Sequence, residues 1–159
     1  MSTSLNPLGF ARSRLSALWL ALFVVVASAH ATSRWATLEA IHHLENPFNL
    51  SRPGAQGELG AYQFKRTTWQ MHTRVPFAHA LDRSVSDAIA VQHYEWLKRG
   101  LENAGRPATP YYIALAWNSG LGAATRGRAP RVAHDYAERA TNLALEFERN
   151  STRRFADVR

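Results

Sequence analysis

Cysteine is absent from this chain of 159 residues. Without thiols the protein forms neither disulfide bonds nor thiolate metal sites. The chain also lacks internal repeats, low-complexity tracts and any alternation of apolar and polar residues long enough for a large sheet. Stability must therefore come from packing, to which five Trp, five Tyr and seven Phe can contribute.

Acidic residues are the minority charge. Twelve Asp and Glu stand against 19 Lys and Arg, which gives a formal net charge of +7. Nucleic acid is a common partner of basic proteins. The basic residues here, however, are scattered along the chain and form neither a basic stripe nor a recognisable nucleic-acid-binding motif. The sequence therefore predicts a protein that attracts anionic surfaces and does not bind nucleic acid.

The N-terminal segment has the features of a secretory leader. Arg12 and Arg14 precede an uncharged apolar run, 15–27, and Ala29-His30-Ala31 matches an A-x-A cleavage site. The run is shorter than the roughly 20 residues that span a bilayer, although an uncleaved anchor is the alternative. The sequence predicts a signal peptide over 1–31 and a protein exported to the periplasm or the extracellular space, with membrane contact only during export.

The remainder suits one domain with a single core, 32–150, and a polar tail, 151–159, expected to be frayed. Five Gly and Pro residues rule out a continuous helix between 46 and 60 and predict a short hairpin or irregular loop there. They are Pro47, Pro53, Gly54, Gly57 and Gly60. The fold class predicted is mainly α, with one small β-hairpin or loop element beside a cleft. The first helix is expected over 34–44, with Thr32 or Ser33 as its cap. The second is expected to be capped by Thr67 and to end before Pro76. Further helices are expected over 84–99, over 110–119 and from Pro130 to about 150.

Local signals set the expected helix ends. Thr109-Pro110 is an N-cap followed by proline at the first helical position. Ser84 with Asp87 approximates a capping box, and Gly100 is the expected stop of that helix. Its core face is predicted to carry Val85, Ile89, Gln92 and Trp96.

Glu45 lies at the expected end of the first helix. Leu38, Ile41 and Glu45 follow the spacing i, i+3 and i+7, which places the carboxyl group on the same face as two core residues. Burial and a helix C-terminus both disfavour a negative charge, so Glu45 is predicted to hold its proton strongly. The adjoining His42 and His43 are interpreted as structural or solvent-exposed residues, because no partner sits at metal-ligand spacing.

A second acid, Glu58, follows after the short loop and precedes the polar pair Tyr62-Gln63. Two carboxyl groups arranged in this way suit glycoside cleavage, in which a protonated acid donates to the leaving oxygen. Most Glu pairs are solvated surface residues, so the pair alone is a weak signal. Asn118-Ser119-Gly120 at the end of an apolar helix and Tyr136 on an otherwise apolar face strengthen it.

These positions together resemble the lysozyme-like soluble lytic transglycosylase family and its relatives, the goose-type lysozymes. Glu45, Gly57, Gly60 and Gln63 match that family's acid followed by Gly-x-x-Gly-x-x-Gln. Its second motif, Ala-Tyr-Asn-x-Gly, appears as 116–120, with Trp117 in place of the tyrosine. Its third motif, a tyrosine followed by a helical Val/Arg segment, appears as 136–139. The chain departs from the family at Asn46, usually serine, at Ala61-Tyr62, usually Leu-Met, and at Glu58, usually a small residue in transglycosylases.

The resemblance implies a lysozyme-like α+β fold and cleavage of the β-1,4 bond between N-acetylmuramic acid and N-acetylglucosamine in peptidoglycan. Glu45 would be the catalytic acid and base of a lytic transglycosylase that yields 1,6-anhydromuramic products. Gln63, Tyr62, Asn118 and Tyr136 would line the cleft and bind substrate. The expected partner is the glycan strand, and the positive charge agrees with it because the cell wall is polyanionic. We expect a monomer without metal or cofactor.

Three alternatives remain open from the sequence. The first is a goose-type-like lysozyme that hydrolyses the same bond, with Glu58 as a second acid that activates water. The second is a non-catalytic glycan-binding module, which the retained acid disfavours. The third is a wall-binding component of an envelope-spanning secretion or conjugation apparatus, a role compatible with enzymatic activity.

Overall fold

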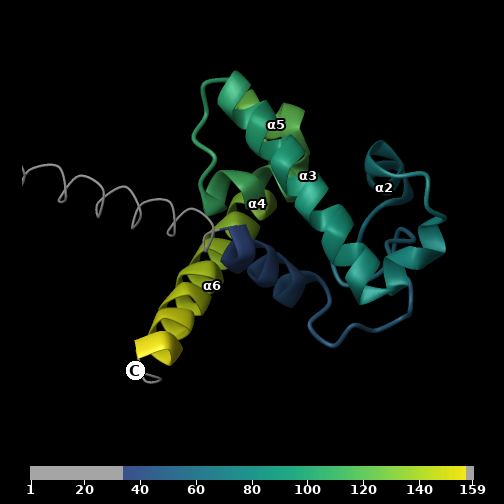
Figure 1. Ribbon diagram of the computed structural model, residues 1–159. Helices are drawn as coiled ribbons and strands as arrows, with labels where there is room; N and C mark the ends of the chain where they lie inside the picture. The colour runs from purple at the N-terminus through teal and green to yellow at the C-terminus, as the bar shows by residue number, and fades with distance from the viewer. Residues whose placement is uncertain (1–33, 157–159) are drawn as a thin grey trace, which may run out of the picture. The chain divides into compact units, whose positions relative to one another are not determined.

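The computed structural model describes residues 34–156, which belong to one compact unit (Figure 1). The predicted leader, 1–31, lies outside the described residues, as do the proposed helix caps Thr32 and Ser33 and residues 157–159 of the predicted tail.

The described chain is mainly helical, as the sequence predicts. The first helix covers residues 34–45. It is followed by α2 (Arg66–His72), the 3-10 helix η1 (Phe77–Leu81), α3 (Arg83–Asn103), α4 (Pro110–Ser119), α5 (Leu121–Thr125) and α6 (Arg131–Ala156). Between residues 34 and 156 no strand forms. The segment expected to be a short hairpin or irregular loop is an irregular loop with one isolated antiparallel bridge between Leu59 and Phe64.

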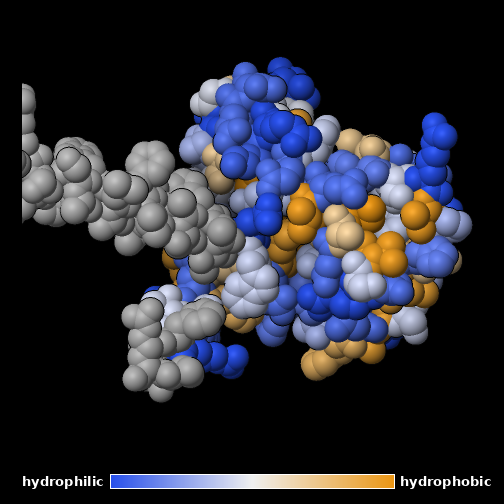
Figure 2. Space-filling model, viewed as in Figure 1, coloured by the Kyte–Doolittle hydropathy of each residue, from blue (hydrophilic) through white to orange (hydrophobic). Residues whose placement is uncertain are grey.

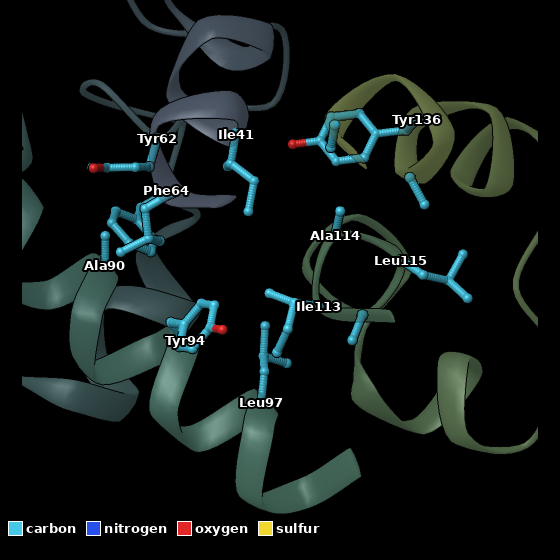
Figure 3. Close-up of a cluster of buried hydrophobic side chains, with 14 of the residues drawn as sticks. Ile41, Tyr62, Phe64, Ala90, Tyr94, Leu97, Ile113, Ala114, Leu115 and Tyr136 are labelled. Carbon is cyan, nitrogen blue, oxygen red and sulfur yellow. The ribbon is translucent and has the colours of Figure 1, made fainter. Parts of the chain in front are cut away.

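Helix α4 is the centre of the fold. Thr109 caps it by accepting a hydrogen bond from the Tyr112 amide, with Pro110 in the first turn, as predicted. Four consecutive residues from Ile113 to Ala116 are buried, so this helix is covered on all sides. Figure 3 shows Ile113 beside Leu97 of α3, and Ala114 and Leu115 on the side facing α6. Alanines of α6 at 133, 137 and 140 are fully buried, which allows the two helices to approach closely.

Helix α3 differs from the sequence-based expectation in its cap, its face and its end. Asp82 caps it, accepting hydrogen bonds from the Ser84 and Val85 amides, whereas the predicted box used Ser84 with Asp87. The buried face is rotated from the predicted one, so that Gln92 is exposed. The buried residues are Ser86, Ile89, Ala90, His93, Tyr94, Leu97 and Leu101.

Gly100 does not end α3, which continues to Asn103. A Cβ atom at this position would lie 2.3 Å from Leu121 Cδ2, so the glycine is where α5 packs against α3. Two other ends also differ. Helix α2 begins at Arg66 with Lys65 rather than Thr67 as its N-cap. Helix α6 continues through residues predicted to fray, with Arg153 and Arg154 in a last turn where positive charge complements the helix dipole.

The surface in Figure 2 is largely hydrophilic, with apolar residues gathered in patches between the charged ones. Large exposed apolar side chains come from several elements: Trp35, Phe48, Leu50, Met71, Val75, Leu81, Val132 and Leu145. Within the part of the chain that the structure describes, no helix is both long and apolar enough to cross a bilayer.

Candidate active site

A cleft of about 560 Å³ opens where four parts of the fold meet. The end of the first helix contributes Glu45, α3 contributes His93, and the C-terminal end of α4 contributes residues 117–119. The loop between the first helix and α2 supplies the remaining wall. Its lining members are Gly54, Ala55, Glu58, Gln63, Phe64 and Lys65, next to Thr68 of α2 and Gly120 after α4.

Glu45 is the last residue of the first helix and is partly buried at the cleft wall. Leu38 and Ile41, the two residues predicted to share its face, are 6% and 0% exposed. Burial raises the pKa of the Glu45 carboxyl, and the charge of Glu58 raises it further, while a hydrogen bond from Tyr136 acts in the opposite direction. The net effect is an acid that keeps its proton above the usual pH range of a glutamate.

Tyr136 lies behind Glu45 rather than in the wall of the cleft. Its ring is buried on α6, and its Oη donates a hydrogen bond of 2.8 Å to Glu45 Oε1. Burial and the adjacent carboxylate raise the pKa of Tyr136 well above the ordinary value, so the hydroxyl remains a donor. The bond occupies one carboxyl oxygen and leaves Oε2 as the oxygen available to carry the acidic proton.

Glu58 borders the same cleft from the loop. Its Oε2 accepts a hydrogen bond of 2.9 Å from the Gln56 amide, so the carboxylate also stabilises its own turn. Gly54 packs against this side chain: a Cβ atom there would lie 2.6 Å from both Glu58 Oε2 and Gln63 Oε1. The glycine therefore lets the loop backbone come close to an acid and an amide at one end of the cleft.

Gln63 lines the cleft in a left-handed conformation, with φ of 43°. Its Nε2 donates to the Gly60 carbonyl at 3.0 Å, which holds the side chain against its own turn. Gly60 also has positive φ, and a Cβ atom there would lie 1.7 Å from the Ala80 carbonyl oxygen. Only glycine fits at this position, which gives the spacing between Gly60 and Gln63 a structural reason.

Asn46 joins the end of the first helix to the following loop through three hydrogen bonds of its side chain. Its Nδ2 donates to the carbonyls of Leu50 at 2.9 Å and Gly60 at 3.1 Å, and its Oδ1 accepts from the Leu50 amide at 2.9 Å. Because Asn46 follows Glu45 directly, these bonds fix the glycine turn relative to the acid.

Asn118 is exposed at the cleft wall near the end of α4. The helix ends at Gly120, which has φ of 84°, and the Ser119 hydroxyl donates back to the Leu115 carbonyl at 2.7 Å. The Asn118 side chain therefore faces solvent in the cleft on a rigid support, with both a donor and an acceptor.

Tyr62 is placed differently from its neighbour Gln63. It is 3% exposed, and its hydroxyl donates to Asp87 Oδ1 at 2.8 Å, on the side of the loop occupied by Arg83. Its ring packs against Phe64 and Trp117, each with a centroid separation of 5.9 Å. Within the described residues Tyr62 supports two lining aromatic rings but does not itself line the cleft.

His93 lines the cleft and has no counterpart among the sequence-predicted site residues. It is 6% exposed on the buried face of α3, and burial together with the neighbouring His72 lowers its pKa to about 3. The sequence contained a signal for it, because Ile89, Ala90, Leu97 and Leu101 share a helical face with position 93.

The described residues contain no group of three or more His, Cys, Asp or Glu side chains that could hold a metal ion. The cleft offers instead one acid with a raised pKa, a second acid, two amides and a histidine around a common space. No family model, curated protein or solved structure matches this chain. Its chemistry must therefore be inferred from the residues of the cleft.

Proposed function

We propose that this chain is an exported peptidoglycan-cleaving enzyme with a lysozyme-like fold, acting as a lytic transglycosylase on the bond between N-acetylmuramic acid and N-acetylglucosamine. The observation that carries the proposal is the environment of Glu45: a carboxyl group with raised pKa at the wall of an open cleft, held by Tyr136. Glycoside cleavage requires an acid that still holds its proton near neutral pH.

In the proposed reaction Glu45 acts first as an acid. Its Oε2 proton passes to the glycosidic oxygen, and the bond between that oxygen and muramic C1 breaks with the electron pair leaving on oxygen. The Glu45 carboxylate then accepts the proton of the muramic C6 hydroxyl as O6 bonds to C1. The acid is regenerated, no water is consumed, and the product is a 1,6-anhydro sugar.

The surroundings support an acid that can return to its protonated form. The Tyr136 hydrogen bond stabilises the carboxylate formed in the first half of the reaction, while burial favours its reprotonation in the second. Gln63 and Asn118 present amide groups to the same cleft and are the proposed contacts for the polar groups of the sugars. Tyr62 is a positioning residue in this scheme, because it supports Trp117 and Phe64 from behind.

A hydrolytic reaction is the second candidate, and one observation favours it. Glu58 borders the same cleft as Glu45, close enough for its charge to raise the pKa of Glu45. A carboxylate in that position can serve as the base that activates water in an inverting glycosidase. We favour transglycosylation because one acid suffices for it and because Glu58 already accepts a bond from the Gln56 amide.

Mass spectrometry of muropeptides released from purified peptidoglycan tests the proposal. Transglycosylation gives anhydromuramic ends, whereas hydrolysis gives reducing ends that are heavier by one water. Release of mainly reducing ends replaces the transglycosylase with the hydrolase. No release by the folded protein would instead support a wall-binding role, such as one in an envelope-spanning secretion or conjugation apparatus.

A further inference from the structure

His93 is held in the cleft wall by aromatic rings on several sides. Trp96 stacks on it with a centroid separation of 5.6 Å and an interplanar angle of 13°. Trp117 meets it edge to face at 4.7 Å and Phe64 at 6.1 Å, and both of these rings also line the cleft. The imidazole therefore has little freedom to rotate and presents a fixed polar group beside an apolar wall.

One ring nitrogen of His93 is already engaged. His93 Nδ1 lies 2.9 Å from His72 Nε2, and one proton between the two rings makes this a hydrogen bond. The other polar atom, His93 Nε2, has no partner among the side chains and backbone groups of residues 34–156. It is also not among the fully buried unsatisfied atoms of that range, so it remains accessible beside the cleft.

The charge state of His93 restricts what it can bind. Its pKa is lowered to about 3 by burial and by His72, so the ring is neutral at physiological pH. Of the other titratable side chains that line the cleft, Glu45 has a raised pKa, and Glu58 and Lys65 are of opposite charge, so the cleft has no excess of positive charge. This combination disfavours a phosphate or carboxylate ligand and favours a neutral group with hydrogen-bonding capacity.

We propose that His93, with Trp117 and Phe64, forms the binding site for an acetamido group of the glycan, a subsite that rests on the proposed function. The acetamido methyl packs against the aromatic wall, and Nε2 makes the hydrogen bond. If Nδ1 accepts from His72, Nε2–H donates to the acetyl carbonyl. If Nδ1 donates, Nε2 accepts from the acetamido N–H. An acetamido group satisfies His93 in either tautomer, whereas a hydroxymethyl group offers no methyl to the apolar wall.

Binding of two matched sugars tests the subsite. The dissociation constants of the N-acetylglucosamine trimer and the glucosamine trimer are measured by calorimetry on the full chain carrying Glu45→Gln, which prevents turnover. His93→Phe keeps an aromatic ring and removes the polar atoms. We expect it to weaken binding of the acetylated trimer about tenfold and to leave the glucosamine trimer unchanged. Equal effects on both trimers, or none, would overturn the subsite.

Two further variants separate ligand binding from a purely structural role. His93→Gln places its amide near the Nε2 position, while His93→Asn places it near Nδ1, toward His72. If the subsite is correct, His93→Gln should keep a larger difference between the dissociation constants of the two trimers than His93→Asn does. A larger difference in His93→Asn would show that only the bond to His72 matters. This pair carries the test if the Phe variant fails to fold. His79→Gln, at an exposed histidine of η1, is the matched control and should change nothing.

Wall cleavage by the unaltered chain distinguishes the two proposals. If that chain releases muropeptides but His93→Phe keeps full discrimination, only the subsite is wrong. If it releases none but binds the acetylated trimer through His93, the enzymatic proposal fails and the subsite survives as a glycan-binding site.

Discussion

Tyr136 and Glu45 are separated by 91 positions in the chain and joined by a hydrogen bond of 2.8 Å. The bond connects α6 to the end of the first helix, and Figure 3 shows Tyr136 with its hydroxyl turned toward the helix that carries Ile41. Because the hydroxyl donates to Oε1, the carboxyl group has a fixed orientation and a defined oxygen for its proton. The catalytic competence proposed for Glu45 therefore depends on a residue outside the cleft wall.

Replacing Glu45 with Gln should abolish wall cleavage, because an amide cannot donate a proton to the glycosidic oxygen. Loss of general acid catalysis is expected to lower the rate at least about 100-fold. Dye release from labelled peptidoglycan measures it, with the exposed Glu146→Gln as a charge-matched control. Near-normal turnover by a folded Glu45→Gln protein would remove Glu45 from the mechanism.

The same substitution should stabilise the protein at neutral pH. A raised pKa in the folded state means that stability is fully present below the unfolded pKa, near the ordinary value of 4.5, and is lost as pH rises through the folded pKa. Glutamine carries no charge at any pH. The melting temperature of Glu45→Gln should therefore exceed that of the unaltered protein at pH 7 and approach it below pH 4. An equal difference at both pH values would contradict the shift.

Tyr136→Phe and Glu58→Gln should move the pKa of Glu45 in opposite directions. The Tyr136 bond lowers that pKa and the Glu58 charge raises it. Activity requires protonated Glu45, so the alkaline limb of kcat/KM against pH should move up in Tyr136→Phe and down in Glu58→Gln. If Glu58 is instead the base for water, its substitution should abolish activity rather than shift the profile.

Gly60 and Gly57 provide a matched pair for stability. Both have φ of 80°, but a Cβ atom at Gly60 would collide with the Ala80 carbonyl, whereas nothing lies within 4 Å at Gly57. Gly57→Ala should cost only the backbone strain, about 1 kcal/mol. Gly60→Ala should cost about 3 kcal/mol or more, since the loop must also move away from η1. Urea denaturation measures both, and similar losses would mean that the Ala80 contact adds nothing.

The exported form should begin at Thr32, directly after the Ala29-His30-Ala31 site. N-terminal sequencing of the protein recovered from the envelope or medium determines the start. An intact Met1 on a membrane-bound species would show that the apolar run is retained as an anchor.

The helical class, α4 with its Thr109 cap, and the apolar face of Glu45 were predictable because each depends on signals within one short stretch. The features that sequence reasoning missed depend on neighbours distant in the chain. Gly100 was predicted to end its helix because glycine commonly does so, but in the fold it makes room for the Leu121 side chain. The helical face of His93 indicated that it is buried, but its place in the cleft depends on Trp117 and Phe64, which come from other parts of the chain.

Tyr62 and Gln63 show the same limit within one turn. Both are polar residues after Gly60, and the sequence suggested a cleft position for each. Positive φ at Gln63 directs the two side chains to different sides of the loop, so that Tyr62 reaches Asp87 while Gln63 reaches the cleft. No pattern in the sequence alone specifies which of these two side chains faces the cleft.

The Asn46 side chain, through its three hydrogen bonds, has a consequence for protein engineering. Its bonds to Leu50 and Gly60 secure the loop near both ends, so the intervening backbone is tethered independently of its length. Ser51, Arg52 and Pro53 are exposed between those anchors. Added loop length costs little entropy, and exposed tips tolerate insertions. This short segment is therefore the natural place to graft a targeting peptide beside the cleft while the acid keeps its position.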